Sequence, residues 1–429
     1  MLFVQYSPPG TNAPANNRVS IKTIDWLKLK VNVTNIIDSN LTLEDLSNKE
    51  LNDKLNSIQE LFFTAASTKP AKNSANNRKK KNSFWWTREL QIIRSNITNN
   101  TLFGNNYNII SNKKKRNPIR KPIVNAQGTP ASTIEESTAN LLDYHFPWSN
   151  RNSYYHHNFS QDDFNSFTQQ EVAAVIHNIK PNKAVGVDGL PGELIKEMFL
   201  ANKKWFVQIL NLLVSKGHFP ELWKIARVVL IQKEGKSLDH PSHFRPICIL
   251  PCWGKVLDKL ISDRLSYHLE KDGMLSDLQY GFRKNRSTIL ALNSILEFHQ
   301  SAKEDNQLTC LISIDMSNVF NSVDWDLLIN KLLKLHIPFY IQSIISSFLQ
   351  DRRAHLNGNS KLYNKGIPQG SSLGPILWNI FINDLLETDF GPNTKVQAFA
   401  DDVLIMIKAP AEYCFTKAST PPLNILDQG

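Results

Sequence analysis

Aspartates stand at the ends of two apolar runs that lie far apart in the sequence. Leu311-Ile312-Ser313-Ile314 ends at Asp315, and Phe399-Ala400-Asp401-Asp402 lies between two runs with strand character, residues 395–398 and 403–407. Asp401 and Asp402 would then occupy the tip of a hairpin. Aspartate is favoured in turns for local reasons alone. A further carboxylate at a second strand end, however, is the arrangement that binds a pair of hard divalent cations.

Three more stretches carry glycines or cations in loops or at the ends of expected strands. The loop 366–375 reads Gly-Ile-Pro-Gln-Gly-Ser-Ser-Leu-Gly-Pro, and its glycines let the backbone approach a ligand closely. An expected strand at 226–233 ends in Lys233, and its expected partner at 244–250 carries Arg245. The loop 279–288 is rich in glycine and cations. A charge at a strand end can be a solvated surface group.

Composition narrows the class of protein. The net charge of the 429-residue chain is +10, which suits a polyanionic partner, either nucleic acid or an anionic membrane surface. No apolar run approaches the ~20 residues that span a bilayer, and the start of the chain lacks a signal-peptide core. We therefore expect an intracellular protein with no membrane segment. The spacing of His240, His243, Cys248 and Cys252 matches no standard zinc site.

Residues 1–150 read as a basic helical and linker region with a poor core. Asparagine, serine, lysine and threonine dominate it, and residues 25–35 show no strong period. A helix is expected within 41–67, where leucines recur at helical spacing. Two basic clusters, Arg78–Lys81 and Lys113–Arg116, flank the aromatic segment Phe84-Trp85-Trp86. Such a stretch either grips phosphates and stacks on bases or is a solvated linker.

Regular structure is expected from Thr168 onward. Thr168-Gln169-Gln170-Glu171 is a capping box that opens a helix. Asn357-Gly358 is a favoured hairpin turn within 354–363. Helices and strands mix without βαβ regularity, which favours an α+β fold with helices backing an antiparallel sheet. Further helices are expected at 193–199, 205–214, 254–269, from 288, at 325–333, 341–349 and from 375.

These motifs, in this order, resemble the palm motifs of reverse transcriptases, and most closely those of non-LTR (LINE-type) retrotransposons. The Gly-Val-Asp-Gly loop at 186–189, between two expected helices, resembles the first fingers motif. The likeness covers residues 168–410, with a weaker one at 78–100, and implies a right-hand polymerase with fingers and an antiparallel palm sheet. Residues 1–150 would be a linker after a missing endonuclease, 151–300 the fingers, and 301–429 a palm truncated before the thumb.

The resemblance also implies a role for each candidate residue. Two Mg²⁺ ions, with Mn²⁺ as a substitute, would be bound by Asp315 and Asp401, supported by Asp402. Phe320 would lie under the sugar of the incoming nucleotide, although it could equally be a core residue. The remaining implied contacts are Gln369 and Gly370 with the incoming nucleotide, Lys233 and Arg245 with its triphosphate, and Arg283 and Arg286 with the template backbone.

The activity implied is RNA-directed DNA synthesis, which adds dNTPs to a DNA primer 3′-hydroxyl on an RNA template. It would operate in the nucleus, where the target is chromosomal DNA; nothing in the sequence sets the oligomeric state. One departure is Asn321, where the family usually has Asp. An alternative is a catalytically inactive, nucleic-acid-binding remnant. Phe320 disfavours an RNA-dependent RNA polymerase, and the intact Pro-Gln-Gly and fingers motifs disfavour an unrelated two-aspartate hydrolase.

Overall fold

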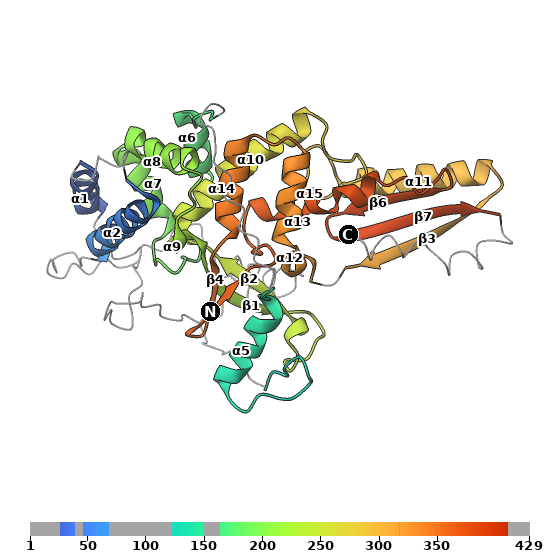
Figure 1. Cartoon of the computed structure of the whole chain (residues 1–429), viewed down its shortest axis with the longest axis horizontal. Helices are drawn as coiled ribbons and strands as arrows, with labels where there is room; N and C mark the ends of the chain where they lie inside the picture. The colour runs from blue at the N-terminus through green and yellow to red at the C-terminus, as the bar shows by residue number, and fades with distance from the viewer. Residues whose placement is uncertain (1–25, 39–45, 68–121, 150–163, 317, 411–429) are drawn as a thin grey trace, which may run out of the picture.

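The computed structural model describes residues 26–38, 46–67, 122–149, 164–316 and 318–410, which form two sheets and the helices that pack against them (Figure 1). The expected α+β layout is confirmed. None of the helices in these ranges is long and apolar enough to cross a membrane. The helices are α1 (Trp26–Asp38), α2 (Asn48–Ser67), α5 (Ile134–His145), α6 (Gln169–His177), α7 (Gly192–Ala201), α8 (Lys203–Ser215), α9 (Glu221–Lys224), the 3₁₀ helix η3 (Pro241–His243), α10 (Cys252–Lys271), α11 (Thr288–Glu304), α12 (Val319–Ser322), α13 (Trp325–Lys334), α14 (Phe339–Leu349) and α15 (Leu373–Glu387). The strands are β1 (Ile225–Gln232), β2 (Phe244–Ile249), β3 (Leu308–Asp315), β4 (Arg352–Leu356), β5 (Asn359–Tyr363), β6 (Thr394–Phe399) and β7 (Asp402–Ala409).

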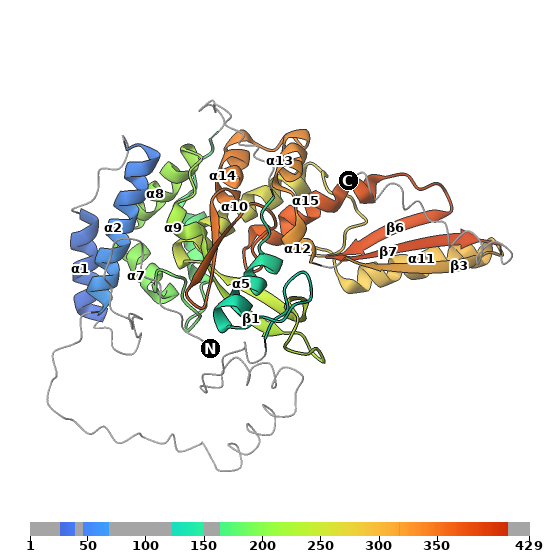
Figure 2. The same ribbon diagram turned by 60° about the horizontal axis from the view of Figure 1, so that its bottom comes forward.

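The sheet that carries the aspartates is antiparallel, with strand order β3-β7-β6. The expected hairpin of β6 and β7 is confirmed, but it closes at the pair Phe399↔Asp402, so its turn is Ala400 and Asp401, and Asp402 belongs to β7. Helix α11 lies along this sheet, and the two together project from one end of the molecule (Figures 1 and 2). Val403 and Ile405 of β7 enter the main hydrophobic core.

The second sheet has strand order β2-β1-β4-β5. The expected pairing of β1 with β2 is confirmed, and the two strands are antiparallel. The expected hairpin of β4 and β5 is also confirmed, and both residues of its turn, Asn357 and Gly358, have positive φ. The pairing of β1 with β4 is parallel and joins Ile225 to Arg353. No local sequence pattern predicts this parallel pairing, because many helical residues separate the two strands.

Helices α1, α2 and α5 correct the expectation of poor packing for the described parts of residues 1–150. Leu29 of α1 and Phe62 of α2 are buried in the main core, and Leu141 and Leu142 of α5 are buried against the second sheet. A helix with few apolar residues can still bury a narrow apolar stripe when that stripe packs against the rest of the fold. The basic clusters and the Phe-Trp-Trp segment lie outside the described residues.

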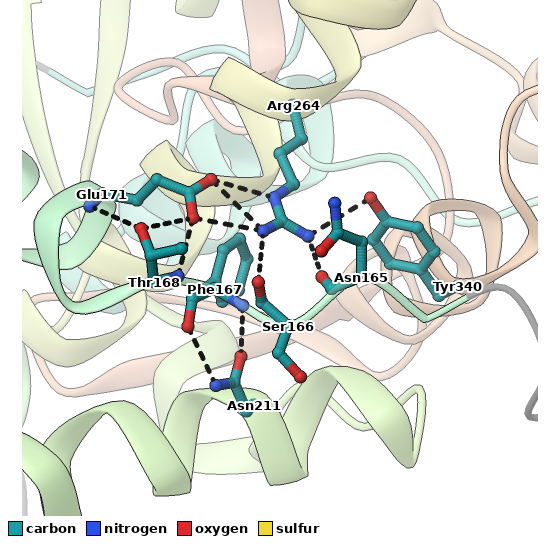
Figure 3. A network of polar contacts seen from close by, with 8 residues as sticks. All are labelled: Asn165, Ser166, Phe167, Thr168, Glu171, Asn211, Arg264 and Tyr340. Atoms are coloured by element: carbon teal, nitrogen blue, oxygen red, sulfur yellow. Dashed lines mark hydrogen bonds and ion pairs between the residues drawn. The ribbon is translucent and has the colours of Figure 1, made fainter.

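Helix α10 is central to the fold, and Arg264 joins it to the start of α6 (Figure 3). Nη2 of Arg264 donates to the Glu171 carboxylate (3.2 Å) and to the Ser166 carbonyl (2.9 Å), and the guanidinium lies 4.2 Å from the centroid of the Phe167 ring. Glu171 also completes the expected capping box with Thr168. Burial would raise the pKa of Glu171, but hydrogen bonds from Thr168 and the charge of Arg264 outweigh burial and lower it.

Candidate active site

The backbone register brings two of the three candidate aspartates together. Asp315, the last residue of β3, is the direct partner of Asp402, the first residue of β7. Directly opposed residues of an antiparallel pair project from the same face of the sheet. Asp401 precedes Asp402 in the turn. None of these carboxylates has a hydrogen-bonding or ion-pairing partner within the described part of the chain.

Unpaired carboxylates are a suitable donor set for a hard cation such as Mg²⁺ or Mn²⁺, which prefers oxygen ligands. Their side chains are not arranged as a finished site. Within the described ranges, no group of three or more His, Cys, Asp or Glu side chains is placed to hold a metal ion. The residue types and the register fit the ions, and the assignment of Asp315, Asp401 and Asp402 as ligands stays a prediction.

The turn that carries Asp401 is held by residues to which the sequence analysis assigned no role. The Ala400 amide donates to Oε1 of the buried Gln279 (3.2 Å), and the Trp378 indole donates to the Ala400 carbonyl (2.9 Å). Gly281 packs against the turn so closely that a Cβ on it would lie 2.0 Å from the Ala400 nitrogen. Ala400 itself has φ +61°, a left-handed conformation that needs such support.

Phe320 is half-buried beside the same turn. Its ring centroid lies 6.0 Å from that of Trp378 and 6.3 Å from that of Phe282, whose side chain is exposed. The Phe320 carbonyl accepts a hydrogen bond from the Ile367 amide. The ring therefore contacts the core on one side and an exposed aromatic on the other. This position is compatible with both sequence interpretations, so the sugar-contacting role stays a prediction.

The Pro-Gln-Gly loop contacts the second sheet through backbone groups. The Cys248 amide of β2 donates to the Gln369 carbonyl (2.7 Å). Gly370 has φ +123°, and a Cβ on it would lie 2.6 Å from the Cys248 carbonyl oxygen, so only glycine fits. Gln369 is half-buried and Gly370 is exposed. The loop therefore joins the sheet carrying Lys233 and Arg245 to the region of the aspartates.

A buried carboxylate lies beneath that loop, and the sequence analysis missed it. Asp258 of α10 is 0% exposed and accepts from the Ser371 hydroxyl (2.7 Å), the Ser372 amide (2.6 Å) and the Leu373 amide (3.1 Å). Burial raises the pKa of Asp258, and hydrogen bonds from Ser372, Ser371 and Leu373 oppose that rise. An acid between apolar positions of an amphipathic helix, next to Leu257, was the available signal.

Lys233 and Arg245 lie on one face of the second sheet. Arg245 is opposite Ile231, and the Lys233 amide continues the ladder by donating to the His243 carbonyl (2.8 Å). By strand alternation both cations project away from the face that buries Cys248. The register thus brings together the two residues expected to bind a triphosphate. They belong to a different sheet from the aspartates.

Arg283 is held by the protein itself, which argues against the expected template contact. Its Nε and Nη2 each donate to the Glu270 carboxylate (2.8 Å), Nη1 donates to the Ser276 carbonyl (2.6 Å), and its side chain is only 5% exposed. The hydrogen bond from Arg283 lowers the pKa of Glu270. Arg286 pairs with the exposed Asp277 and is more accessible to a partner than Arg283.

Comparison with known proteins finds similarity to reverse transcriptases. A profile of the family described as reverse transcriptase (RNA-dependent DNA polymerase) matches residues 231–420. The probable RNA-directed DNA polymerase from transposon BS of Drosophila melanogaster is 28% identical over 63% of this chain and 32% of its own length. The RNA-directed DNA polymerase from mobile element jockey of the same organism is 27% identical over 61% of this chain and 30% of its own.

Two further proteins are similar to parts of this chain. The Pol polyprotein of the type-1 retrotransposable element R2 of Popillia japonica is 28% identical over 57% of this chain and 35% of its own length. Apo telomerase from Candida tropicalis has a TM-score of 0.36 at 13% identity over 48% of this chain and 41% of the telomerase. The chain spans about a third of the length of the transposon relatives. Residues 231–420 are therefore a reverse transcriptase domain, related in sequence to the RNA-directed DNA polymerases of non-LTR retrotransposons.

Proposed function

We propose that the chain is the fingers and palm of an RNA-directed DNA polymerase that adds dNTPs to a DNA primer 3′-hydroxyl on an RNA template. The observation that carries the proposal is the register of Asp315 with Asp402, beside Asp401 in the turn, with all three carboxylates unpaired within the described residues. Carboxylates without counter-charges are unfavourable neighbours unless a cation joins them. Residues 151–300 would be the fingers and 301–429 the palm, with α1 and α2 packed into the main core as an extension of the fingers.

In this mechanism Asp315 and Asp401, supported by Asp402, would hold two Mg²⁺ ions, or Mn²⁺ in their place. Ions held by these carboxylates would supply the charge that activates the primer hydroxyl and neutralises the leaving oxygens. Lys233 and Arg245, on one face of the second sheet, would bind the triphosphate and stabilise its developing charge.

The Pro-Gln-Gly loop and Phe320 would orient the nucleotide in the same reaction. The backbone at Gly370 can approach the substrate because no side chain stands there. Phe320 would occupy the space that a ribose 2′-hydroxyl needs. Template contacts would come from Arg286 rather than from Arg283, whose guanidinium is bound to Glu270. Action on chromosomal DNA would place the protein in the nucleus.

The test is primer extension on an RNA template with dNTPs and Mg²⁺, run beside RNA binding measured by gel shift. We expect the parent chain to extend the primer and Asp401→Asn not to extend it, while both bind RNA with the same affinity. Asp263→Asn is the matched control, because Asp263 is an exposed aspartate whose ion pair within the described residues is with Lys259 on α10. Binding without extension by the parent chain would support the inactive-remnant alternative. Undiminished extension by Asp401→Asn would remove Asp401 from the mechanism.

A further inference from the structure

The last turn of α5 contacts the loop that leads from Asp315 into α12. Oη of Tyr144 accepts a hydrogen bond from Nδ2 of Asn318 (2.6 Å). Nδ1 of His145 lies 3.3 Å from Nδ2 of Asn321, and Nε2 of His145 lies 3.0 Å from the Pro241 carbonyl oxygen. His145 and Asn321 are both buried. Two adjacent residues of α5 thus bind both ends of a four-residue segment that contains Phe320.

The direction of these hydrogen bonds follows from the partners. Nδ2 of Asn321 can only donate, so Nδ1 of His145 accepts, and Nε2 carries the proton that it donates to Pro241. The imidazole is therefore neutral. Burial, together with the charge of Lys233, lowers the pKa of His145 to about 4, although the bond to Pro241 opposes this shift. An aspartate at position 321 would present only acceptors to Nδ1, so His145 is matched to the asparagine of this chain.

The opposite side of the segment is held by the Pro-Gln-Gly loop. The Ile367 amide donates to the Phe320 carbonyl, and a Cβ on Gly366 would lie 2.7 Å from the Asn321 Cα. Asn318 has φ +56°, a conformation in which asparagine is one of the few tolerated residues. The backbone of Phe320 is therefore fixed between α5 and the loop that carries Gln369. Its position depends on a helix outside the reverse transcriptase profile match.

We propose that Tyr144 and His145 are positioning residues that hold the Asn318–Asn321 segment and thereby set the place of the Phe320 ring. The proposal rests on the proposed function, because it gives the positioned ring the task of selecting the sugar. Through Pro241, which precedes β2, His145 also joins this segment to the strand that carries Arg245. One helix end would thus align the sugar-contacting ring with the strand of the triphosphate site.

The test uses the full chain with Tyr144→Phe and His145→Ala. Tyr144→Phe removes only the hydroxyl and keeps the ring, so it should fold normally even if His145→Ala does not. Asp143→Asn is the matched control, since Asp143 is the preceding residue of α5 and pairs with Lys361 of β5 instead. Two quantities are measured for each variant. They are hydrogen exchange of the amides in residues 318–323, and the ratio of the affinities for dATP and ATP.

For Tyr144→Phe we expect exchange in residues 318–323 to rise about five- to tenfold, the loss of roughly one hydrogen bond, and the preference for dATP to fall. Asp143→Asn should change neither quantity. Unchanged exchange in Tyr144→Phe would overturn the proposal regardless of nucleotide binding. Faster exchange with an unaltered ratio of the affinities for dATP and ATP would show that the contacts stabilise the segment but do not influence sugar selection, which would also overturn the proposal. If the parent chain binds neither nucleotide, the proposed function fails, and the positioning role fails with it.

Discussion

Replacing Asp258 by asparagine should loosen the Pro-Gln-Gly loop without unfolding α10. The carboxylate faces donors only, namely the Ser371 hydroxyl and the amides of Ser372 and Leu373. Asparagine can keep the oxygen that serves Ser371 and Leu373, but it then presents an NH₂ group to the Ser372 amide. One charge-assisted hydrogen bond is lost and one donor is left without an acceptor, which costs about 2–4 kcal/mol.

That cost should appear as local opening of the loop at Ser372 and Leu373, where the other hydrogen bonds to the body of the fold include Cys248 amide to Gln369 carbonyl and Ser262 hydroxyl to Ser372 carbonyl (2.9 Å). A change of 2–4 kcal/mol corresponds to roughly 30- to 700-fold faster exchange of the Ser372 and Leu373 amides, if exchange proceeds through local opening. Hydrogen exchange followed by mass spectrometry measures this on residues 368–376. Primer extension should show a raised KM for dNTPs, because Gln369 and Gly370 would no longer be held in place.

Asp263→Asn is the control for this experiment as well. Asp263 lies on the same helix and makes a surface ion pair with Lys259, so its loss should change stability by no more than ~0.5 kcal/mol. Unchanged exchange of residues 368–376 in Asp258→Asn would refute the claim that this carboxylate holds the loop. A uniform rise in exchange over all of α10 and α15 would show instead that Asp258 stabilises the core as a whole.

Four other substitutions test three separate predictions. Burial raises the pKa of Asp188 to about 7, so the contribution of this group to stability is present below about pH 4 and is lost as the pH rises through about 7. The free energy of unfolding in urea of Asp188→Asn minus that of the parent should therefore increase from pH 5 to pH 8. A constant difference would contradict this. Phe320→Val should raise ribonucleotide use relative to deoxyribonucleotide use in primer extension, whereas a loss of ~2–4 kcal/mol of stability with an unaltered sugar ratio would identify a core residue. Arg286→Gln should reduce the slope of log RNA affinity against log salt by about one if it contacts a phosphate, while Arg283→Gln should leave that slope unchanged and destabilise the fold by ~1–3 kcal/mol.

Local chemistry made part of this fold predictable. The capping box at Thr168 and the Asn357-Gly358 turn depend on residues that are neighbours in sequence, and both appear as expected. The hairpin around Asp401 follows from strand alternation on either side of a turn. The parallel pairing of β1 with β4 has no such signal, because it is decided by how the intervening helices pack. The packing of α5 on the second sheet is unpredictable for the same reason.

Some residues of the candidate site can likewise be predicted from the sequence, and others cannot. Residues that would touch substrate, such as Asp401 and Gln369, are recognisable because their chemistry and spacing are unusual for a loop. Arg283 is the exception, since a cation in a glycine-rich loop has the same sequence signal whether it meets a phosphate or Glu270. Its near-complete burial separates the two cases, and burial of a single arginine is a property of the folded chain.

Each loop of the site is held by a buried polar side chain that lies outside the motif it supports. Gln279 binds the turn at Ala400, Asp258 binds the loop after Gln369, and His145 binds the segment of Phe320. The physical reason is general, because a loop packed into a protein buries backbone or amide groups that α-helices and strands would satisfy internally, and these groups need partners from elsewhere. Two of the three partners lie within the reverse transcriptase profile match, and His145 lies before it. A chain that began after residue 150 would keep every predicted catalytic motif and lose one of the three supports, so we expect α5 to matter for activity together with the aspartates.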